Sequence, residues 1–295
     1  MEKILVTGGS GLLGSKIVKL AGDNYEIIPT HHQHSLFSNS IEMNITKREK
    51  VFKVIQKFKP DVLIHAAGET DVDKCETDKK WAWKANVEGT KNIVEACSKS
   101  GARLIYISTD YIFDGQKGHY SENDSVNPVS YYGLTKLKGE EIIEEECEKY
   151  AIARASAIYG WHKWKLNFAT WIISSLRKGT NINIVEDHYD SPTLADNLAE
   201  LVLKIVDKKA SGIYNTAGSE RINRYLFALN IAKIFDLNKK LVTPIQMKDL
   251  KPWVAKRPRD SSLIVDKAQG EFGVKLLSTE EGLMRMKEQE ERKEI

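Results

Sequence analysis

A tyrosine and a lysine stand four residues apart in the sequence, at Tyr132 and Lys136. On a helix this spacing brings the two side chains to one face, with their Cβ atoms roughly 5–6 Å apart. A tyrosine with a pKa of roughly 10 is a weak acid at neutral pH, and we expect the lysine cation to lower that pKa by stabilising the phenolate. Such a pair suits proton transfer to or from a substrate oxygen, although the pattern also arises by chance on surface helices.

Two hydroxyl side chains, Ser108 and Thr109, follow a short apolar run at 103–107 that we predict to be a strand. Ligands in open α/β sheets bind at the carboxyl ends of the strands, so both hydroxyls are placed where a substrate carbonyl would bind. The tyrosine and lysine open a predicted helix at 131–148, directly after a loop that contains Pro128. The convergence of these groups on one sheet edge favours catalysis over the alternative, in which the hydroxyls only cap the strand end.

A glycine-rich turn, TGGSGLLG at 7–14, lies between a predicted strand at 3–7 and a predicted helix at 12–21. Glycines permit the tight turn and the close approach of a diphosphate, and the N–H groups that begin the helix favour an anion. The position of the turn between strand and helix is the context that a dinucleotide-binding motif requires. The residues assigned to the cofactor here are Gly8, Ser10, Gly11, Leu12, Leu13 and Gly14.

The end of the second predicted strand, at 25–29, bears on the type of dinucleotide. A carboxylate there would bind the adenosine ribose of NAD, but the sequence has Thr30, His31 and His32 instead. Either histidine could meet a 2′-phosphate, and both could equally be ordinary loop residues. We therefore favour NADP as the cofactor, with NAD as the alternative.

Apolar runs and helical patterns alternate along the chain, which implies parallel strands joined by crossover helices. We predict an α/β fold: a Rossmann-type, doubly wound parallel sheet with a smaller C-terminal substrate-binding region. The dinucleotide-binding domain is expected at 1–160 and the substrate-binding region, interleaved with it, at 161–295. The elements predicted besides those above are strands at 61–65, 151–155 and 212–216, helices at 47–58, 79–98, 167–177, 193–206, 223–235 and 278–295, and a loop at 251–260.

The bulk composition excludes several function classes. The 44 basic and 41 acidic residues nearly balance, which argues against a nucleic-acid or membrane partner. The cysteines are three in number, without metal-site spacing, and the carboxylates are scattered, so we predict no metal and a reducing, cytoplasmic location. A homodimer is the oligomer that we consider.

Several ordered segments resemble the TDP-4-dehydrorhamnose reductase family of extended short-chain dehydrogenases, over almost the whole chain. They are ISTDYIFDG at 107–115, NPVSYYGLTKLKGE at 127–140, KLNF at 165–168, DHYDSPT at 187–193 and RPRDSSL at 257–263. This resemblance implies a catalytic triad of Thr109, Tyr132 and Lys136. A nicotinamide hydride would reduce the C4 carbonyl of a nucleotide-linked keto-sugar, with TDP-4-dehydrorhamnose becoming TDP-L-rhamnose.

The same resemblance assigns roles around the triad. Tyr132 would donate the proton, Thr109 would hydrogen-bond the carbonyl, and Lys136 would bind the nicotinamide ribose. Further cofactor contacts would come from His31, Asn44, Ile45, Ala66, Ala67, Gly68, Thr70 and Ser108. Substrate contacts would come from Tyr111, Asn167, His188 and Arg257, of which the arginine would hold the nucleotide diphosphate.

Five positions depart from the family pattern. Lys165 stands in place of a glycine, and Asn44 in place of an aspartate on the adenine side. Ala157 stands where the family has a tryptophan that packs on the sugar, His188 replaces a glutamine, and Glu69 replaces a tyrosine. The cofactor and catalytic parts are kept while the substrate pocket is altered, which leaves the sugar open. Two alternatives follow: an epimerase or dehydratase of the same superfamily, and an NADP-binding regulatory subunit similar to the β subunit of methionine adenosyltransferase.

Overall fold

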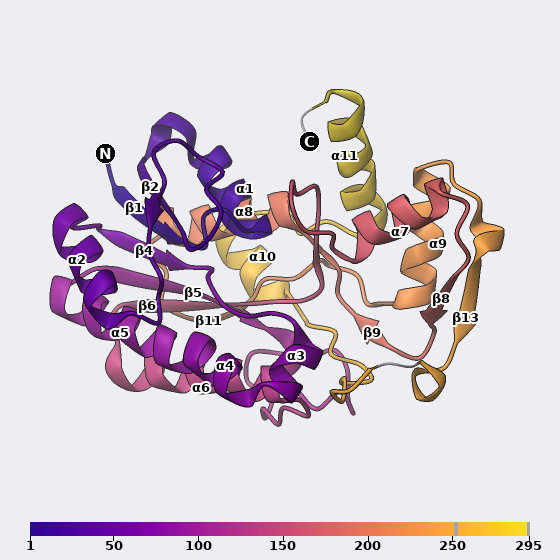
Figure 1. The fold of residues 1–295 in the computed structure, drawn as a ribbon, viewed down its shortest axis with the longest axis horizontal. Helices are drawn as coiled ribbons and strands as arrows, with labels where there is room; N and C mark the ends of the chain where they lie inside the picture. Colours follow the sequence, from indigo (N-terminus) through magenta and orange to yellow (C-terminus); the bar gives the residue numbers. More distant parts are fainter. Residues whose placement is uncertain (251–252, 294–295) are drawn as a thin grey trace.

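A seven-stranded parallel sheet forms the centre of the molecule (Figure 1). The computed structural model describes residues 1–250 and 253–293. Every neighbouring pair in the sheet is parallel, which confirms the predicted doubly wound Rossmann-type fold. Across the sheet the strands run in the order β11 (Gly212–Asn215), β6 (Tyr150–Ala155), β5 (Arg103–Thr109), β4 (Val62–His65), β1 (Lys3–Thr7), β2 (Glu26–His31) and β3 (Ile41–Glu42).

The central strands are apolar on both faces because helices cover both sides of the sheet. In β1, for example, Ile4 and Val6 join the core on one face and Leu5 joins the core on the other. The first face is covered by α1 (Leu12–Ala21), α8 (Ala195–Asp207) and α10 (Asp266–Phe272). The second face is covered by α2 (Arg48–Phe58), α5 (Gly89–Ser100) and α6 (Tyr131–Glu146).

A third apolar core lies beyond the sheet, where the C-terminal half of the chain packs on itself. Figure 1 shows these elements on the opposite side of the molecule from α2 and β2. Yet β11 and α8, which also follow residue 160, belong to the central sheet and its covering layer. The elements of the third core are α7 (Phe168–Arg177), α9 (Arg224–Ile234), α11 (Thr279–Glu291) and the strands β8 (Ile182–Val185) and β13 (Val242–Ile245).

The helix predicted at 79–98 is interrupted. The structure has α3 (Val72–Thr77), α4 (Lys79–Trp83), a π-helical turn over Lys84–Glu88, and then α5. Asp78 caps α4 by accepting a hydrogen bond from the Trp81 N–H. In the π turn, the side chain of Asn86 bonds both the N–H and the carbonyl of Glu69. These contacts to a distant loop fix the interruption, so the local helical pattern did not reveal it.

Several short strands were also not predicted: β7 (Ile158–Tyr159) pairs with β10 (Thr193–Leu194), and β9 (Tyr189–Asp190) with β12 (Ile222–Asn223). The positions 251–252 of the predicted loop and 294–295 of the predicted last helix lie outside the described residues. None of the described helices combines the length and the apolar character needed to cross a membrane.

Glu140 and Arg154 form a buried ion pair between α6 and β6, with 1% and 4% of their side chains exposed and 2.7 Å between Oε2 and Nη2. Removal of one partner leaves an uncompensated buried charge, so Glu140→Ala should lower the free energy of unfolding by about 3–5 kcal/mol. Glu280→Ala, which breaks the exposed pair with Lys233, should cost less than about 1 kcal/mol. Denaturant unfolding of the two variants measures the difference, and equal losses would contradict this account.

Candidate functional site

The predicted catalytic side chains meet at the carboxyl end of β5. Thr109 is the last residue of that strand, and Tyr132 and Lys136 lie on one face of α6. Ser130 caps this helix, and Gly133 lets it approach the 110–112 turn, because a Cβ at Gly133 would lie 2.1 Å from the Tyr111 carbonyl oxygen. All three catalytic candidates are buried and line one cavity of about 570 Å³.

The electrostatics of the tyrosine and lysine differ from the expectation. Burial raises the pKa of Tyr132, and Lys136 does not offset this rise, so the prediction that the lysine lowers this pKa was wrong. Lys136 donates a 2.7 Å hydrogen bond to the Ile107 carbonyl, and its ammonium lies 3.9 Å from the centre of the Tyr106 ring. Burial lowers the pKa of Lys136 to about 7. Tyr132 is therefore fully protonated at neutral pH, as a proton donor must be.

A buried carboxylate fixes the orientation of Thr109. Asp110 accepts hydrogen bonds from the hydroxyls of Thr109 (3.1 Å), Ser156 (2.8 Å) and Ser261 (2.5 Å). Burial raises the pKa of Asp110, and the three hydroxyls act against this rise. Neither Ser156, the residue after β6, nor Ser261, in the C-terminal segment, was predicted to belong to the site, because both are far from Thr109 in the chain.

The glycine-rich turn has the geometry that a diphosphate requires. Gly8 has a φ of +65°, and a Cβ on Gly14 would lie 2.2 Å from the Gly8 carbonyl oxygen. Gly11 caps α1 without any side-chain hydrogen bond, so the N–H groups of the first helical turn are left for another partner. Gly11, Leu12 and Leu13 line the cavity that holds Tyr132. The turn and the cavity together fit the phosphates and the nicotinamide of a dinucleotide.

The other predicted cofactor residues divide into two groups. Those after β4 and β5 line the same cavity, namely Ala66, Ala67, Gly68, Thr70 and Ser108. His31, Asn44 and Ile45 are outside that wall: His31 bonds Ser40 (2.8 Å), and Asn44 accepts from the Thr46 N–H (2.9 Å). Ile45 is buried in the core between α2 and α5. This second group lies near the ends of β2 and β3.

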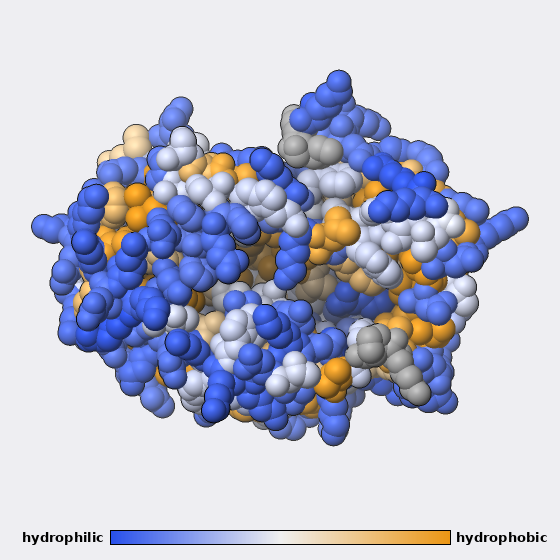
Figure 2. All heavy atoms as spheres, viewed as in Figure 1, coloured by the Kyte–Doolittle hydropathy of each residue, from blue (hydrophilic) through white to orange (hydrophobic). Residues whose placement is uncertain are grey.

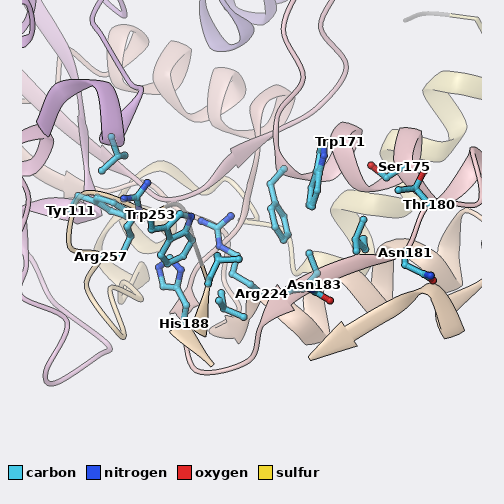
Figure 3. A pocket seen from close by; sticks show the side chains of 16 residues that line it. Tyr111, Trp171, Ser175, Thr180, Asn181, Asn183, His188, Arg224, Trp253 and Arg257 are labelled. Atoms are coloured by element: carbon cyan, nitrogen blue, oxygen red, sulfur yellow. The ribbon is translucent and has the colours of Figure 1, made fainter. Parts of the chain in front are cut away.

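A second cavity, of about 590 Å³, adjoins the first. Val72, Tyr111 and Arg224 line both. Aromatic side chains from α7 and from the segment after 252 form part of its wall, with His188 and Arg257 near Trp253 (Figure 3). Figure 2 shows the surface hollowed between the sheet-containing part and the C-terminal elements. Together the two cavities form an elongated binding region.

The predicted substrate residues all line this region, but their polar groups differ in availability. Both ring nitrogens of the buried His188 lack a hydrogen-bond partner among the described residues. Asn167 caps α7 and donates to the Gly160 carbonyl, and Arg257 binds the carboxylate of Asp73 with both terminal nitrogens. Tyr111 packs edge-on against Tyr132, with 5.8 Å between ring centres.

Arg224 and the backbone conformation of Ala157, a residue already expected in the sugar pocket, were not predicted. Arg224, at the start of α9, pairs with the buried Asp190 at 2.6 Å between Nε and Oδ2. Ala157 lines the first cavity with a φ of +41°, a backbone region that disfavours bulky side chains. Within the described parts of the chain, no group of three His, Cys, Asp or Glu residues could hold a metal ion.

Comparisons with known proteins agree with this geometry. The family model of the RmlD substrate binding domain matches residues 1–292. A dTDP-4-dehydrorhamnose reductase from Aggregatibacter actinomycetemcomitans is 33% identical over 289 residues, which cover 93% of this chain and 94% of the relative. The dTDP-4-dehydrorhamnose reductase of Bacillus anthracis, solved in complex with NADP, has a TM-score of 0.89 and 28% identity, covering 98% of this chain and 99% of its own. The methionine adenosyltransferase 2 subunit beta of Xenopus tropicalis is 29% identical over 252 residues, 83% of this chain and 75% of the relative.

Gly14→Ala tests the glycine-rich turn. The added Cβ would meet the Gly8 carbonyl at 2.2 Å, so the turn must open and the affinity for NADPH should fall roughly tenfold or more, equivalent to about 1.4 kcal/mol. Gly270→Ala is the control, since a Cβ there has no neighbour within 4 Å. Titration of NADPH fluorescence gives both dissociation constants, and an unchanged affinity in Gly14→Ala would argue against a cofactor at this turn.

Proposed function

Because the chain belongs to the RmlD substrate binding domain family, we propose that it is an NADPH-dependent reductase of a nucleotide-linked 4-keto-sugar. The specific reaction proposed is the reduction of TDP-4-dehydrorhamnose to TDP-L-rhamnose. The relatives named as reductases carry this substrate, dTDP-4-dehydrorhamnose, in their names. The observation that carries this proposal is the cavity in which Thr109, Tyr132 and Lys136 meet the glycine-rich turn. A reductase needs a proton donor and a dinucleotide at the same carbonyl, and this cavity offers places for both.

We propose NADP as the cofactor, with NAD as the second choice, because a reductase relative was solved in complex with NADP. The glycine-rich turn would hold the diphosphate, and the buried end near Ser108 and Thr109 would take the nicotinamide, which supplies the hydride to the carbonyl carbon. Lys136 would bind the nicotinamide ribose from its place beside the Ile107 carbonyl. His31 lies near the end of β2 but outside the cavity wall, so its proposed contact with a 2′-phosphate belongs to the adenosine end.

The residues of this chain would handle the proton and the carbonyl oxygen. As the carbonyl carbon gains the hydride, its oxygen becomes basic and takes the phenolic proton of Tyr132. To hydrogen-bond the oxygen beside that phenol, the Thr109 hydroxyl turns away from Asp110, to which it donates at 3.1 Å in this structure. The resulting phenolate lies in a buried site, where burial disfavours its negative charge and therefore favours its return to the protonated form. Tyr132 recovers a proton from solvent before the next turnover.

Two alternatives are less well supported. A dehydratase would need free carboxylates beside Thr109, but Asp110 is engaged by three hydroxyls, and the next residue is Tyr111. The regulatory alternative rests on similarity to the methionine adenosyltransferase subunit. A regulatory subunit would not need the catalytic triad that this chain retains, so the triad favours the reductase.

The homodimer and the cytoplasmic location also belong to this proposal. Three free, buried cysteines support a reducing compartment.

Tyr132→Phe tests the proposed proton donor. Loss of general acid catalysis should lower kcat by roughly 10²–10⁴-fold, measured as NADPH oxidation at about 340 nm with TDP-4-dehydrorhamnose. Tyr131→Phe, the same change one residue earlier on α6, should keep nearly full activity. Absence of turnover in the natural protein, with NADPH still bound, would refute the rhamnose reductase and favour another keto-sugar or the regulatory subunit.

The lowered pKa of Lys136 predicts the pH dependence. A lysine whose pKa is about 7 loses its positive charge as the pH rises through that value, whereas Tyr132 keeps its proton. The kcat/KM for NADPH, which reports the free enzyme, should therefore be constant at acidic pH and fall above about pH 7. Lys138→Met, on the exposed side of α6, should leave the profile unchanged. A profile that is flat into the alkaline range would exclude this role for Lys136.

A further inference from the structure

Arg224 stands at the boundary between the two cavities. It is one of the three residues that line both of them, together with Val72 and Tyr111. Figure 3 shows it between two groups: Tyr111, His188, Trp253 and Arg257 on one side, and Trp171 with residues of the 175–183 segment on the other. A ligand that extends from the catalytic end into the second cavity must pass this side chain.

The guanidinium of Arg224 is held from one end only. Asp190 pairs with its Nε at 2.6 Å, and the charge lies 4.7 Å from the centre of the Phe168 ring. The contact printed for this ion pair is made by Nε, and neither terminal nitrogen donates a hydrogen bond within the described part of the chain. Asp190 raises the pKa of Arg224, so the side chain keeps its charge despite burial. A charged fork with both terminal nitrogens available matches two oxygens of a phosphate group.

The other arginine of the wall is not available in this way. The fork of Arg257 is filled by Asp73, with 2.8 Å between Nη2 and Oδ2, and Nη1 also donates to the Ala255 carbonyl. Asp73 in addition accepts the N–H groups of Val254 and Ala255 at 2.9 Å. Arg257 thus fastens the 253–257 segment to α3, and it contributes positive charge without a free fork.

His188 supplies a second available polar group next to this fork. Burial, aided by the charges of Arg224 and Arg257, holds the pKa of His188 well below its usual value, so the imidazole is neutral. One ring nitrogen of a neutral imidazole carries a hydrogen, and neither nitrogen of His188 has a partner among the described residues. Its buried N–H therefore needs an acceptor, which a ligand in the second cavity would provide.

We propose that Arg224 is the residue that binds the diphosphate of the substrate, with His188 as a further donor and Asp190 as the positioning residue that orients the guanidinium. The nucleoside then occupies the second cavity, against Phe168 and Trp171, and the sugar reaches Tyr132 in the first. Only the sugar part of this arrangement rests on the proposed function. The contact between Arg224 and a diphosphate concerns binding alone and can be tested without turnover.

Titration calorimetry of NADPH-saturated protein tests this proposal, because the saturated cofactor site cannot take up a second nucleotide. The probes are thymidine diphosphate and thymidine. In Arg224→Gln the dissociation constant of thymidine diphosphate should rise by roughly 10- to 100-fold, from the loss of a charged bidentate contact, while that of thymidine stays the same. Arg224→Lys should give an intermediate value, since it keeps the charge but loses the fork. Arg221→Lys is the matched control, because Arg221 pairs with Asp260 outside the two cavities.

The double variant Arg224→Gln with Asp190→Asn removes the unpaired buried carboxylate that the single change leaves. If Arg224 contacts the diphosphate, the double variant binds thymidine diphosphate as weakly as Arg224→Gln. Recovery of the natural affinity in the double variant, or an equal loss for thymidine, would overturn the proposal and make Arg224 structural. Arg224-dependent binding of thymidine diphosphate without keto-sugar reduction would refute the reductase and support this inference. Reduction of the keto-sugar by Arg224→Gln with an unchanged KM for that sugar would support the reductase and refute the role of Arg224.

Discussion

The carboxylate of Asp110 is the contact on which the arrangement of the site depends. An ionised group removed from water is costly unless hydrogen bonds replace the lost hydration, and here three hydroxyls do so. They come from the end of β5, from the residue after β6, and from the C-terminal segment. The same contact that makes burial of Asp110 tolerable therefore ties the catalytic threonine to both halves of the chain. The cavities lie where these halves meet.

The sequence was most informative where the chemistry is local. The bounds of β1 and α1 were predicted correctly. The apolar run, the glycines and the helical pattern follow one another directly, so the glycines mark both the end of the strand and the start of the helix. The meeting of Thr109 with Tyr132 and Lys136 was also predictable, since parallel strands bring their carboxyl ends to one edge. The interruption near Asn86 was not, because its cause is a contact with Glu69 and not a local pattern.

The electrostatic part of the site could not be obtained from spacing. The four-residue interval placed Lys136 on the same helix face as Tyr132, but burial decides both pKa values. Likewise, the charged residues of the wall gave no sign of which arginine is free. Asp73 and Arg257 are 184 positions apart, and only the folded chain shows that they neutralise each other and that Asp190 leaves the fork of Arg224 open.

The late position of β11 in the chain has a consequence for biosynthesis. The sheet edge at β6 is completed by Gly212–Asn215, although β6 itself ends at Ala155. At roughly 5–20 residues per second, the ribosome needs several seconds to supply the missing strand. During that interval the nascent chain presents an unpaired, apolar edge that can pair with other chains. Co-translational folding of this protein thus has a defined vulnerable window, in which a chaperone that shields strand edges would raise the yield of native protein.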